Sequence, residues 1–263
     1  MGHSNTSERK KDHIELAFKS HVSEREERFY YEPLFKSHPS ELQFELEMGA
    51  SKMKAPIWIS SMTGGTKEAG TINRNLAKAA GEYGLGMGLG SCRIILDDNT
   101  HLKDFQLRDL AQDAPLYANL GIAQLEELFE KGQSQKIIEL VKKTETDGLI
   151  IHVNPLQEWL QPEGDRFLKA PIDTIKSCLD LNLSIIVKEV GQGFGPKSLK
   201  ALMELPLTAI DFGAHGGTNF SKLELNRASE LRHEAYDEMA HWGHTAEEML
   251  EFYNALIKEM GSS

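Results

Sequence analysis

The stretch DGLIIHVNPLQE, residues 147–158, decides the fold of this chain. Its first half is a short apolar run rich in β-branched residues, which is typical of a buried strand rather than a helix. Four side chains able to bind a ligand or a metal follow where that strand ends, namely His152, Asn154, Gln157 and Glu158. Parallel α/β proteins bind ligands at the carboxyl ends of their strands, so this placement predicts a binding site. A capped strand and a polar turn would explain any one of these residues, but four together favour a site.

Strands and helices alternate on both sides of this stretch. Five further apolar or glycine-rich runs predict strands, at residues 57–62, 85–89, 115–119, 184–190 and 209–213. Helical patterns cover residues 67–83, 102–110, 123–143, 172–181, 196–203 and 246–258. Short links between alternating elements imply a parallel sheet with right-handed crossovers.

Polar residues recur at or shortly after the ends of all six predicted strands, as Thr63, Ser91, Asn119, His152, Lys188 and Thr218. A doubly wound sheet concentrates its site at one switch point, whereas a barrel draws residues from every strand. The pattern therefore favours a TIM (β/α)8-type barrel. Such a barrel has eight units and this chain shows six, so we expect an α/β barrel truncated after the sixth βα unit.

The first part of the chain lacks this rhythm and is charged and aromatic. We interpret residues 1–54 as an N-terminal extension and residues 55–263 as an incomplete barrel domain. The net charge of −11 argues against nucleic-acid binding, which needs a basic footprint. No secretory signal, no run of eighteen apolar residues and only two cysteines are present, so we expect a soluble cytoplasmic protein without a membrane span.

Several residues carry the chemistry of a phosphorylated ligand. Glu158 is the best metal candidate, because Mg²⁺ needs only one or two carboxylates when substrate phosphates supply further oxygens. Arg9 and Lys10 lie in the densest basic cluster, although a solvated tail is the default for a charge run at a terminus. Arg93 is a second cationic candidate. The glycine-rich run 213–218 is typical of an anion-binding nest.

Other sites are less well supported. The glycine runs at residues 84–90 and 191–195 do not satisfy the dinucleotide-binding pattern, and no P-loop is present. His241 and His244 invite a metal interpretation, but without a paired carboxylate a helix surface explains them better. Lys188, near a strand end, is expected either to be paired or to face an electron-rich ligand.

Seven motifs, taken in order, resemble those of the type 2 isopentenyl-diphosphate isomerases. They are RKxxHI at residues 9–14, SSMTGG at 60–65, GSxR at 90–93, ANLG at 118–121, HxNxxQE at 152–158, VKEVG at 187–191 and GGT at 216–218. These are FMN-dependent TIM-barrel enzymes that interconvert isopentenyl and dimethylallyl diphosphate with no net redox change. The resemblance implies this fold and activity, with Mg²⁺, with NADPH as the reductant of the flavin, and with a homo-oligomer, a tetramer or octamer.

The resemblance also implies residue roles. Substrate would be bound by Arg9, Lys10, Arg93, His152, Asn154 and Gln157, and Glu158 would bind Mg²⁺. Gln157 and His152 would act nearest the reacting atoms. FMN would be lined by Ser61, Met62, Thr63, Ser91, Asn119, Lys188, Gly213 and Thr218. Because the cofactor carries the difficult chemistry, few protein acids and bases are needed.

The chain departs from the family pattern in two ways. Family members often have serine where Gly213 stands, so only the backbone would serve a flavin phosphate there. The family pattern also continues beyond a sixth unit. Two alternatives therefore stay open: another FMN-dependent barrel oxidoreductase acting on a 2-hydroxy acid, and an inactive truncated remnant of the isomerase.

Overall fold

The computed structural model describes residues 6–24, 31–35, 37–38, 41–61 and 63–261. The chain divides into two compact units, residues 1–43 and 44–263. The first unit contains helix α1 (Thr6–Ala17), most of whose described side chains are exposed. The division falls before the hairpin of β1 (Leu46–Met48) and β2 (Ser51–Met53), so these strands belong to the second unit although the sequence placed them in the extension.

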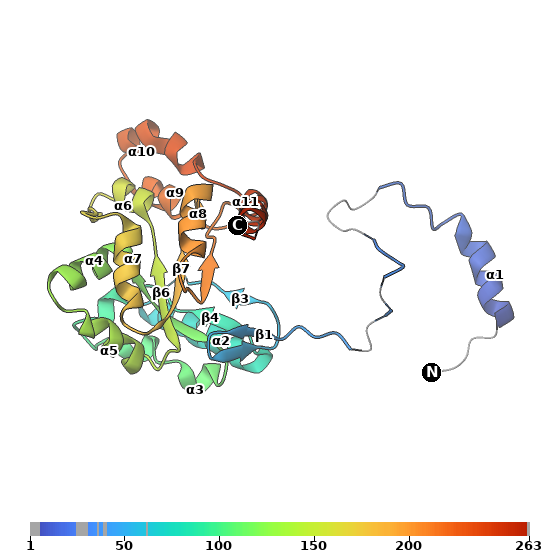
Figure 1. The fold of residues 1–263 in the computed structure, drawn as a ribbon, viewed down its shortest axis with the longest axis horizontal. Coiled ribbons are helices and arrows are strands. Elements are labelled where there is room, and N and C mark those ends of the chain that lie inside the picture. The colour runs from blue at the N-terminus through green and yellow to red at the C-terminus, as the bar shows by residue number, and fades with distance from the viewer. Residues whose placement is uncertain (1–5, 25–30, 36, 39–40, 62, 262–263) are drawn as a thin grey trace. The chain divides into compact units, whose positions relative to one another are not determined.

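The second unit is built on one parallel sheet whose strands follow chain order (Figure 1). The strands are β3 (Trp58–Ile59), β4 (Gly86–Gly88), β5 (Leu116–Gly121), β6 (Gly148–His152), β7 (Ser184–Lys188) and β8 (Ala209–Asp211). Each strand pairs in parallel with the next. A curled sheet of consecutive parallel strands joined by helices is the wall of a TIM-type barrel, as the sequence predicted.

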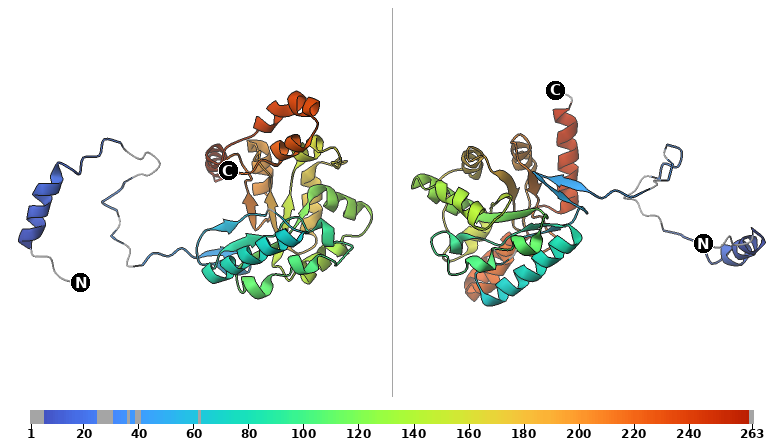
Figure 2. Two further views of the ribbon diagram at one scale, coloured as in Figure 1. Left: turned by 180° about the vertical axis from the view of Figure 1, so that it is seen from behind. Right: turned by 90° about the horizontal axis from the view of Figure 1, so that it is seen from below.

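Most of the helices cover the outer face of this sheet, as two further views show (Figure 2). They are α2 (Lys67–Tyr83), α3 (Arg108–Ala111), α4 (Ile122–Glu130), α5 (Gln135–Lys143), α7 (Pro171–Leu179), α8 (Pro196–Met203) and α11 (Ala246–Met260). Helices α6 (Pro155–Leu160) and α10 (Glu230–Tyr236) instead pack against α9 (Phe220–Arg227), and α6 and α9 contribute to the carboxyl end of the sheet. Short 3₁₀ helices cover Arg93–Ile95, Leu102–Asp104 and Asp237–His241. No helix in the described part of the chain is long and apolar enough to cross a membrane.

Helix predictions were accurate where local signals mark both ends. Helix α2 matches its predicted range because the Thr66 hydroxyl accepts from the Ala69 amide at 3.1 Å and Gly84 ends the helix with φ 65°. The single helix predicted over 123–143 is wrong. The chain forms α4 and α5 instead, because Gly132 adopts φ 64° between them. The helix predicted over 102–110 is likewise only a 3₁₀ turn followed by the short α3.

The core has two layers on opposite faces of the sheet. The larger cluster lies between strands and helices and includes Leu149, Ile151, Ile185 and Val187. A smaller cluster of Tyr117, Ile150 and Ile186 lies on the inner face, where Met48, Trp58 and Ala209 pack against it. Side chains alternate between faces along a strand, so these three residues fix which later residues point inward.

The β1–β2 hairpin closes the amino-terminal end of the inner face. A side chain at Gly49, whose φ is 61°, would come within 2.9 Å of both the Ser184 and the Tyr117 hydroxyls. Tyr117 and Ser184 are hydrogen-bonded at 2.9 Å, and Ser184 also bonds Thr208 at 2.6 Å. With that end closed, the carboxyl ends of the strands are left to form a site.

Candidate functional site

The strand register brings polar side chains into one row at the carboxyl end of the sheet. Gly121 pairs with His152, His152 with Lys188, and Lys188 with Asp211. Each of these residues lies two positions beyond an inward position, so the side chains of His152, Lys188 and Asp211 point inward as well. Asn119, two residues beyond Tyr117, joins them. The sheet alone therefore gathers four polar side chains from four strands.

His152 is held as a neutral ring. Its Nδ1 lies 2.8 Å from Asn119 Oδ1, while Asn119 Nδ2 donates to the carbonyl oxygen of Leu89 at 3.0 Å. Burial and the positive charge of Lys188 lower the pKa of His152 to about 4. With Nδ1 donating to Asn119, the other ring nitrogen is a hydrogen-bond acceptor. Binding a phosphate oxygen through this nitrogen would require the ring to take up a proton.

Lys188 provides a buried positive charge in the same row. Its ammonium donates to the Glu189 carbonyl oxygen at 3.0 Å and lies 3.6 Å from Asp211 Oδ2. Ser60 Oγ donates to the same Asp211 oxygen at 3.3 Å. Lys188 is therefore both paired and exposed to the interior of the site, which combines the two possibilities that the sequence left open.

A cavity of about 120 Å³ lies over this row. Its lining consists of Ser61, Gly90, Ser91, Asn119, His152, Gln157, Lys188, Val190 and Phe220. Six of these are residues predicted from the sequence, and they come from five different strand ends or the helix that follows. Ser61 Oγ is buried and has no hydrogen-bond partner among the described residues. An unpaired buried hydroxyl at a cavity fits the presence of a polar ligand.

Beside the cavity, Glu158 and its neighbours form an oxygen-rich cluster at the start of α6. Asn154 Nδ2 donates to Glu158 Oε1 at 2.9 Å and to Gln157 Oε1 at 3.0 Å. Asn154 Oδ1 is buried and has no hydrogen-bond partner among the described residues. One carboxylate with two amide oxygens suits a hard cation that keeps water and substrate ligands. The described residues contain no group of three His, Cys, Asp or Glu side chains placed to hold a metal, so substrate oxygens would have to complete such a site.

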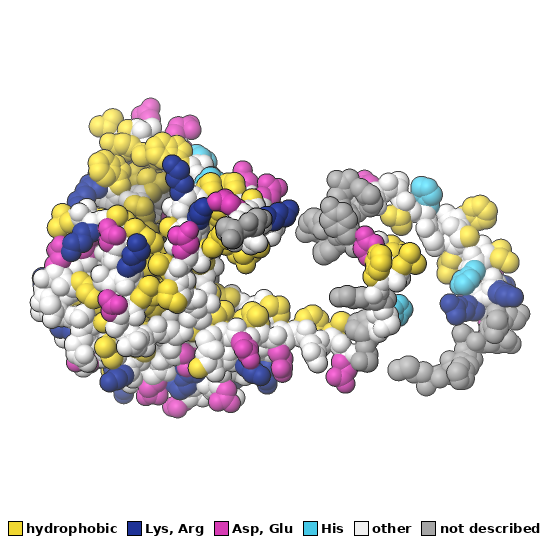
Figure 3. Space-filling view, in the orientation of Figure 1, with side chains coloured by type: hydrophobic (Ala, Val, Ile, Leu, Met, Phe, Trp, Pro, Cys, Tyr) yellow, Lys and Arg dark blue, Asp and Glu magenta, His cyan; other side chains and the backbone are white. Residues whose placement is uncertain are grey.

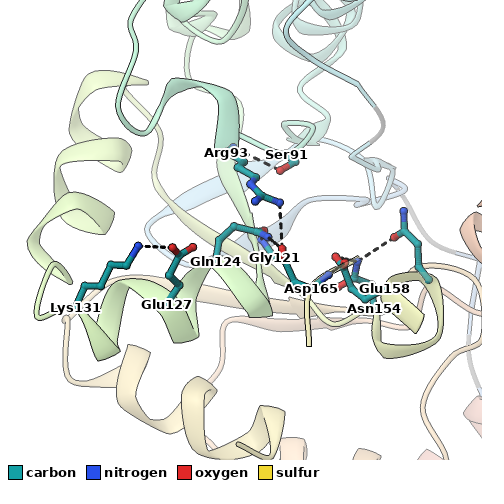
Figure 4. A network of polar contacts seen from close by, with 10 residues as sticks. Ser91, Arg93, Gly121, Gln124, Glu127, Lys131, Asn154, Glu158 and Asp165 are labelled. Atoms are coloured by element: carbon teal, nitrogen blue, oxygen red, sulfur yellow. Dashed lines mark hydrogen bonds and ion pairs between the residues drawn. The ribbon is translucent and has the colours of Figure 1, made fainter. Parts of the chain in front are cut away.

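Asp165, on the loop after α6, connects this cluster to Arg93 (Figure 4). Its backbone amide donates to Glu158 Oε2 at 2.8 Å. Its carboxylate accepts from Arg93 Nη1 and from Gln124 Nε2, each at 3.1 Å. Arg93 itself is exposed, so it is a cation held at the edge of the site.

The loop after β7 is organised by a buried carboxylate. Glu189 Oε2 accepts hydrogen bonds from the amides of Gly191, Gln192 and Gly193, at 2.8, 2.6 and 2.9 Å. Burial raises the pKa of Glu189, and these backbone bonds oppose that effect. This loop leads away from Lys188 and forms part of the site's wall through Val190.

Besides Asp211 in the inner row, two acidic residues of the site were not predicted from the sequence. Asp165 is one, and Glu224 on α9 is the other. Glu224 is buried, accepts from Gln157 Nε2 at 3.3 Å and pairs with Arg227 Nη1 at 2.8 Å. Both the oxygen and the nitrogen of the Gln157 side-chain amide are thus hydrogen-bonded. No local pattern marks the contacts of these acids with Arg93 and Gln157, because those partners lie 72 and 67 positions away in the sequence.

Several predicted residues are not among those described as lining the cavity. Arg9 and Lys10 are exposed on α1 in the other unit, and Met62 lies outside the described residues. Thr63 is half-buried, and a side chain at Gly90 would come within 2.1 Å of its carbonyl oxygen. Thr218 is exposed beyond β8. The roles assigned to these residues remain predictions.

The run 213–218 differs in detail from a free anion nest. The Gly213 amide donates to Asp211 Oδ1 at 3.2 Å, and the His215 amide donates to the His244 carbonyl oxygen at 3.0 Å. Gly213 has φ 52°, and a Cβ there would lie 2.0 Å from the Glu189 carbonyl oxygen. Serine at position 213 is therefore incompatible with this backbone. Two of the backbone amides that were expected to bind a phosphate therefore donate hydrogen bonds to other parts of the chain.

A larger apolar groove of about 760 Å³ lies outside the sheet between α7 and α8. Trp159 and Trp242 stand beside it with about half their surface exposed, at 51% and 57%. Figure 3 shows hydrophobic side chains gathered near α10 on this side of the unit. The surface of the groove is mainly apolar, so the polar candidate site is the one at the strand ends.

Parallel strands in chain order, with helices outside and a polar row inside their carboxyl ends, define a (β/α)-barrel protein with a candidate ligand site at the strand ends. No protein-family model matches the chain. Curated relatives do match it. An isopentenyl-diphosphate delta-isomerase of Rickettsia felis is 36% identical over 244 residues, which is 90% of this chain and 70% of the relative. That of Rickettsia typhi is 35% identical over 261 residues, or 96% and 75% of the two chains.

The chain therefore belongs to the isopentenyl-diphosphate delta-isomerase family, in agreement with its type 2 motifs. Among solved structures, a mandelate oxidase mutant with an FMN adduct aligns over 70% of this chain and 56% of its own. At 10% identity and a TM-score of 0.44, that likeness supports no further conclusion.

Proposed function

We propose that this chain isomerises isopentenyl diphosphate to dimethylallyl diphosphate and back, using FMN reduced by NADPH together with Mg²⁺. Family membership supports the reaction. The observation that carries the assignment to this site is the cavity where Ser61, Ser91, Asn119, His152, Gln157 and Lys188 meet. These six residues come from five separate motifs of the sequence, and the fold brings them to the wall of one cavity.

The flavin would lie against the inner row. Lys188 would place its charge beside the electron-rich part of the ring, and Asn119, Ser91 and the unpaired Ser61 hydroxyl would meet its polar edge. Thr63, Gly213 and Thr218 are the further candidates from the sequence, as is Met62. When bound, reduced flavin supplies the proton exchange with the alkene that the protein's own side chains lack.

Mg²⁺ would be held by Glu158, with the unpaired Asn154 Oδ1 as a second oxygen. Arg93 would bind the substrate diphosphate, because its guanidinium suits paired phosphate oxygens. Arg9 and Lys10 would add positive charge that the acidic chain otherwise lacks. The metal and these cations together would offset the charge of the diphosphate.

The remaining residues orient the alkene and exclude water. Gln157 is fixed between Asn154 and Glu224, so its amide presents a defined edge to the substrate. His152 remains neutral beside it, and Val190 and Phe220 supply apolar wall. The resemblance further supports a cytoplasmic homo-oligomer, a tetramer or octamer.

The test is to incubate the chain with isopentenyl diphosphate, FMN, NADPH and Mg²⁺ and to follow dimethylallyl diphosphate by NMR. We expect interconversion that requires Mg²⁺ and consumes no stoichiometric reductant. Glu158→Gln should lower activity by about tenfold to a hundredfold and weaken the Mg²⁺ dependence. Glu163→Gln is the control, because Glu163 is exposed and its one ion pair among the described residues is with Arg227 at 3.3 Å.

Two outcomes would contradict this proposal. Oxidation of a 2-hydroxy acid would favour the oxidoreductase alternative. Absence of turnover with every cofactor present would favour the inactive remnant.

A further inference from the structure

The loop between α6 and α7, residues 161–170, is attached to neighbouring elements by charged groups. The amides of Leu168 and Lys169 donate to Glu126 Oε1 on α4, at 3.0 and 2.8 Å. Lys169 also pairs with Glu130 at 3.6 Å. These bonds fix the second half of the loop, and Asp165 fixes the first half.

Asp165 contacts both Arg93, a predicted diphosphate ligand, and Glu158, a predicted Mg²⁺ ligand, through different atoms. Its side chain holds Arg93 Nη1 and Gln124 Nε2 on one oxygen, Oδ2. Gln124 in turn accepts from the Gly121 amide at 3.1 Å, which ties the carboxylate to the end of β5. Its main-chain amide holds Glu158 Oε2 at 2.8 Å. One residue therefore sets the position of a cation and of a metal-binding carboxylate.

The approach of the loop to Glu158 depends on the preceding glycine. A Cβ at Gly164 would lie 1.9 Å from the Glu158 carbonyl oxygen, which is backbone and cannot give way. Gly164 thus permits the short distance that brings the Asp165 amide to the Glu158 carboxylate. The path of the backbone through Gly164 therefore places Asp165 where it contacts both Glu158 and Arg93.

Asp165 leaves Arg93 able to bind an anion. It occupies Nη1 of the guanidinium, and no hydrogen bond from Nε or Nη2 occurs among the described residues. The side chains are partly exposed, at 59% for Arg93 and 39% for Asp165, so the pair adds little to folding stability. Its effect is to direct a long, flexible side chain toward one place.

We propose that Asp165 is a positioning residue that couples Arg93 to Glu158, so that a divalent cation and a diphosphate are held together. The proposal rests on the diphosphate function described above. It assigns a role to a residue that contacts neither ligand.

The test uses inorganic pyrophosphate with Mg²⁺, measured by calorimetry on the full chain. Asp165→Asn should weaken pyrophosphate binding about threefold to tenfold and leave Mg²⁺ binding unchanged, since the backbone amide remains. Asp165→Glu should restore part of the loss. In an Arg93→Gln background, Asp165→Asn should have little further effect, because the coupled partner is gone.

Two further variants separate positioning from general damage. Glu130→Gln removes the other ion pair of the same loop and should leave pyrophosphate binding unchanged. Gly164→Ala should weaken both Mg²⁺ and pyrophosphate binding, with circular dichroism confirming that the variant folds.

Unchanged or tighter pyrophosphate binding by Asp165→Asn would overturn the positioning role, and tighter binding would mean that Asp165 competes with the ligand. If the wild-type chain binds no pyrophosphate, the proposed diphosphate site fails instead. The mobility of the Arg93 guanidinium, measured by NMR relaxation of its Nε–H group, then decides the positioning role. Equal mobility in the wild-type chain and in Asp165→Asn overturns it.

Discussion

At the level of single residues, His152 shows how the strand ends set the chemistry of a side chain. Asn119 fixes one nitrogen, and Lys188 lies in the same row on the next strand. Burial of the ring and the positive charge of Lys188 lower the pKa of His152 to about 4, which keeps the ring uncharged near neutral pH. A neutral histidine beside a buried lysine orients a ligand without repelling that lysine.

This shift predicts a loss of stability in acid. The folded pKa is about 4 and the ordinary value is 6.5, so the unfolded chain takes up a proton as pH falls below 6.5 while the folded chain does not. The free energy of unfolding should fall between pH 6.5 and 4, by at most about 3 kcal/mol from this residue. Above pH 6.5 the titration of His152 should not change the free energy of unfolding. Urea unfolding at several pH values measures the effect.

His152→Gln isolates this contribution, because it removes the titrating ring and leaves the other titratable side chains in place. The variant should lose less stability than the wild-type chain over this pH range. His241→Gln, at an exposed position, should keep the wild-type profile. Parallel profiles for the wild-type chain and His152→Gln would refute the expectation.

The site residues that could be predicted are those next to strands. Asn119, His152 and Lys188 follow apolar runs, and parallel register brings such positions together. Asp165 and Glu224 could not be predicted, since their partners are chosen by tertiary packing and no spacing marks them.

At the level of elements, prediction succeeded where a local signal ends the element. Thr66 and Gly84 mark the two ends of α2, and the length of the apolar run marks the extent of β6. The β1–β2 hairpin was missed because its strands are three residues long and largely exposed. Its place is determined by the inner core beneath Met48 and Gly49, which no local pattern reveals.

The packing of the segment after β8 against the end of β7 gives a prediction at this scale. Gly213→Ala should lower the free energy of unfolding by about 2 kcal/mol or more, because the new Cβ would overlap the Glu189 carbonyl oxygen and φ is positive. Gly217→Ala is the matched control, since a Cβ there meets nothing within 4 Å. Urea unfolding compares the two. Equal effects would mean that β7 and the chain at Gly213 are not in such close contact.

At the level of the whole molecule, the division into two units gives a further prediction. The core clusters, including a small one of Leu160, Leu225 and Ala240, lie between Met48 and Leu256, so the described residues of the segment 1–43 contribute to none of them. Removing residues 1–43 should leave the circular dichroism spectrum of the sheet and the urea midpoint unchanged. Pyrophosphate affinity should fall, because Arg9 and Lys10 would be lost.

Deleting α11 is the contrasting experiment, because Met249 and Leu256 belong to the main core. That deletion should lower the urea midpoint sharply. A chain lacking residues 1–43 that failed to fold would show that the first unit has a structural role.

The hydrogen bonds that Glu189 accepts from three successive amides affect how a ligand would bind. A glycine-rich loop usually loses much conformational entropy when a ligand orders it. Here that loss occurs during folding, because a side chain of the same loop already fixes the amides of Gly191, Gln192 and Gly193. Val190, which lines the cavity over Lys188, directly precedes these fixed amides. A ligand in that cavity therefore meets a preorganised wall at Val190, and more of its contact energy is available as affinity.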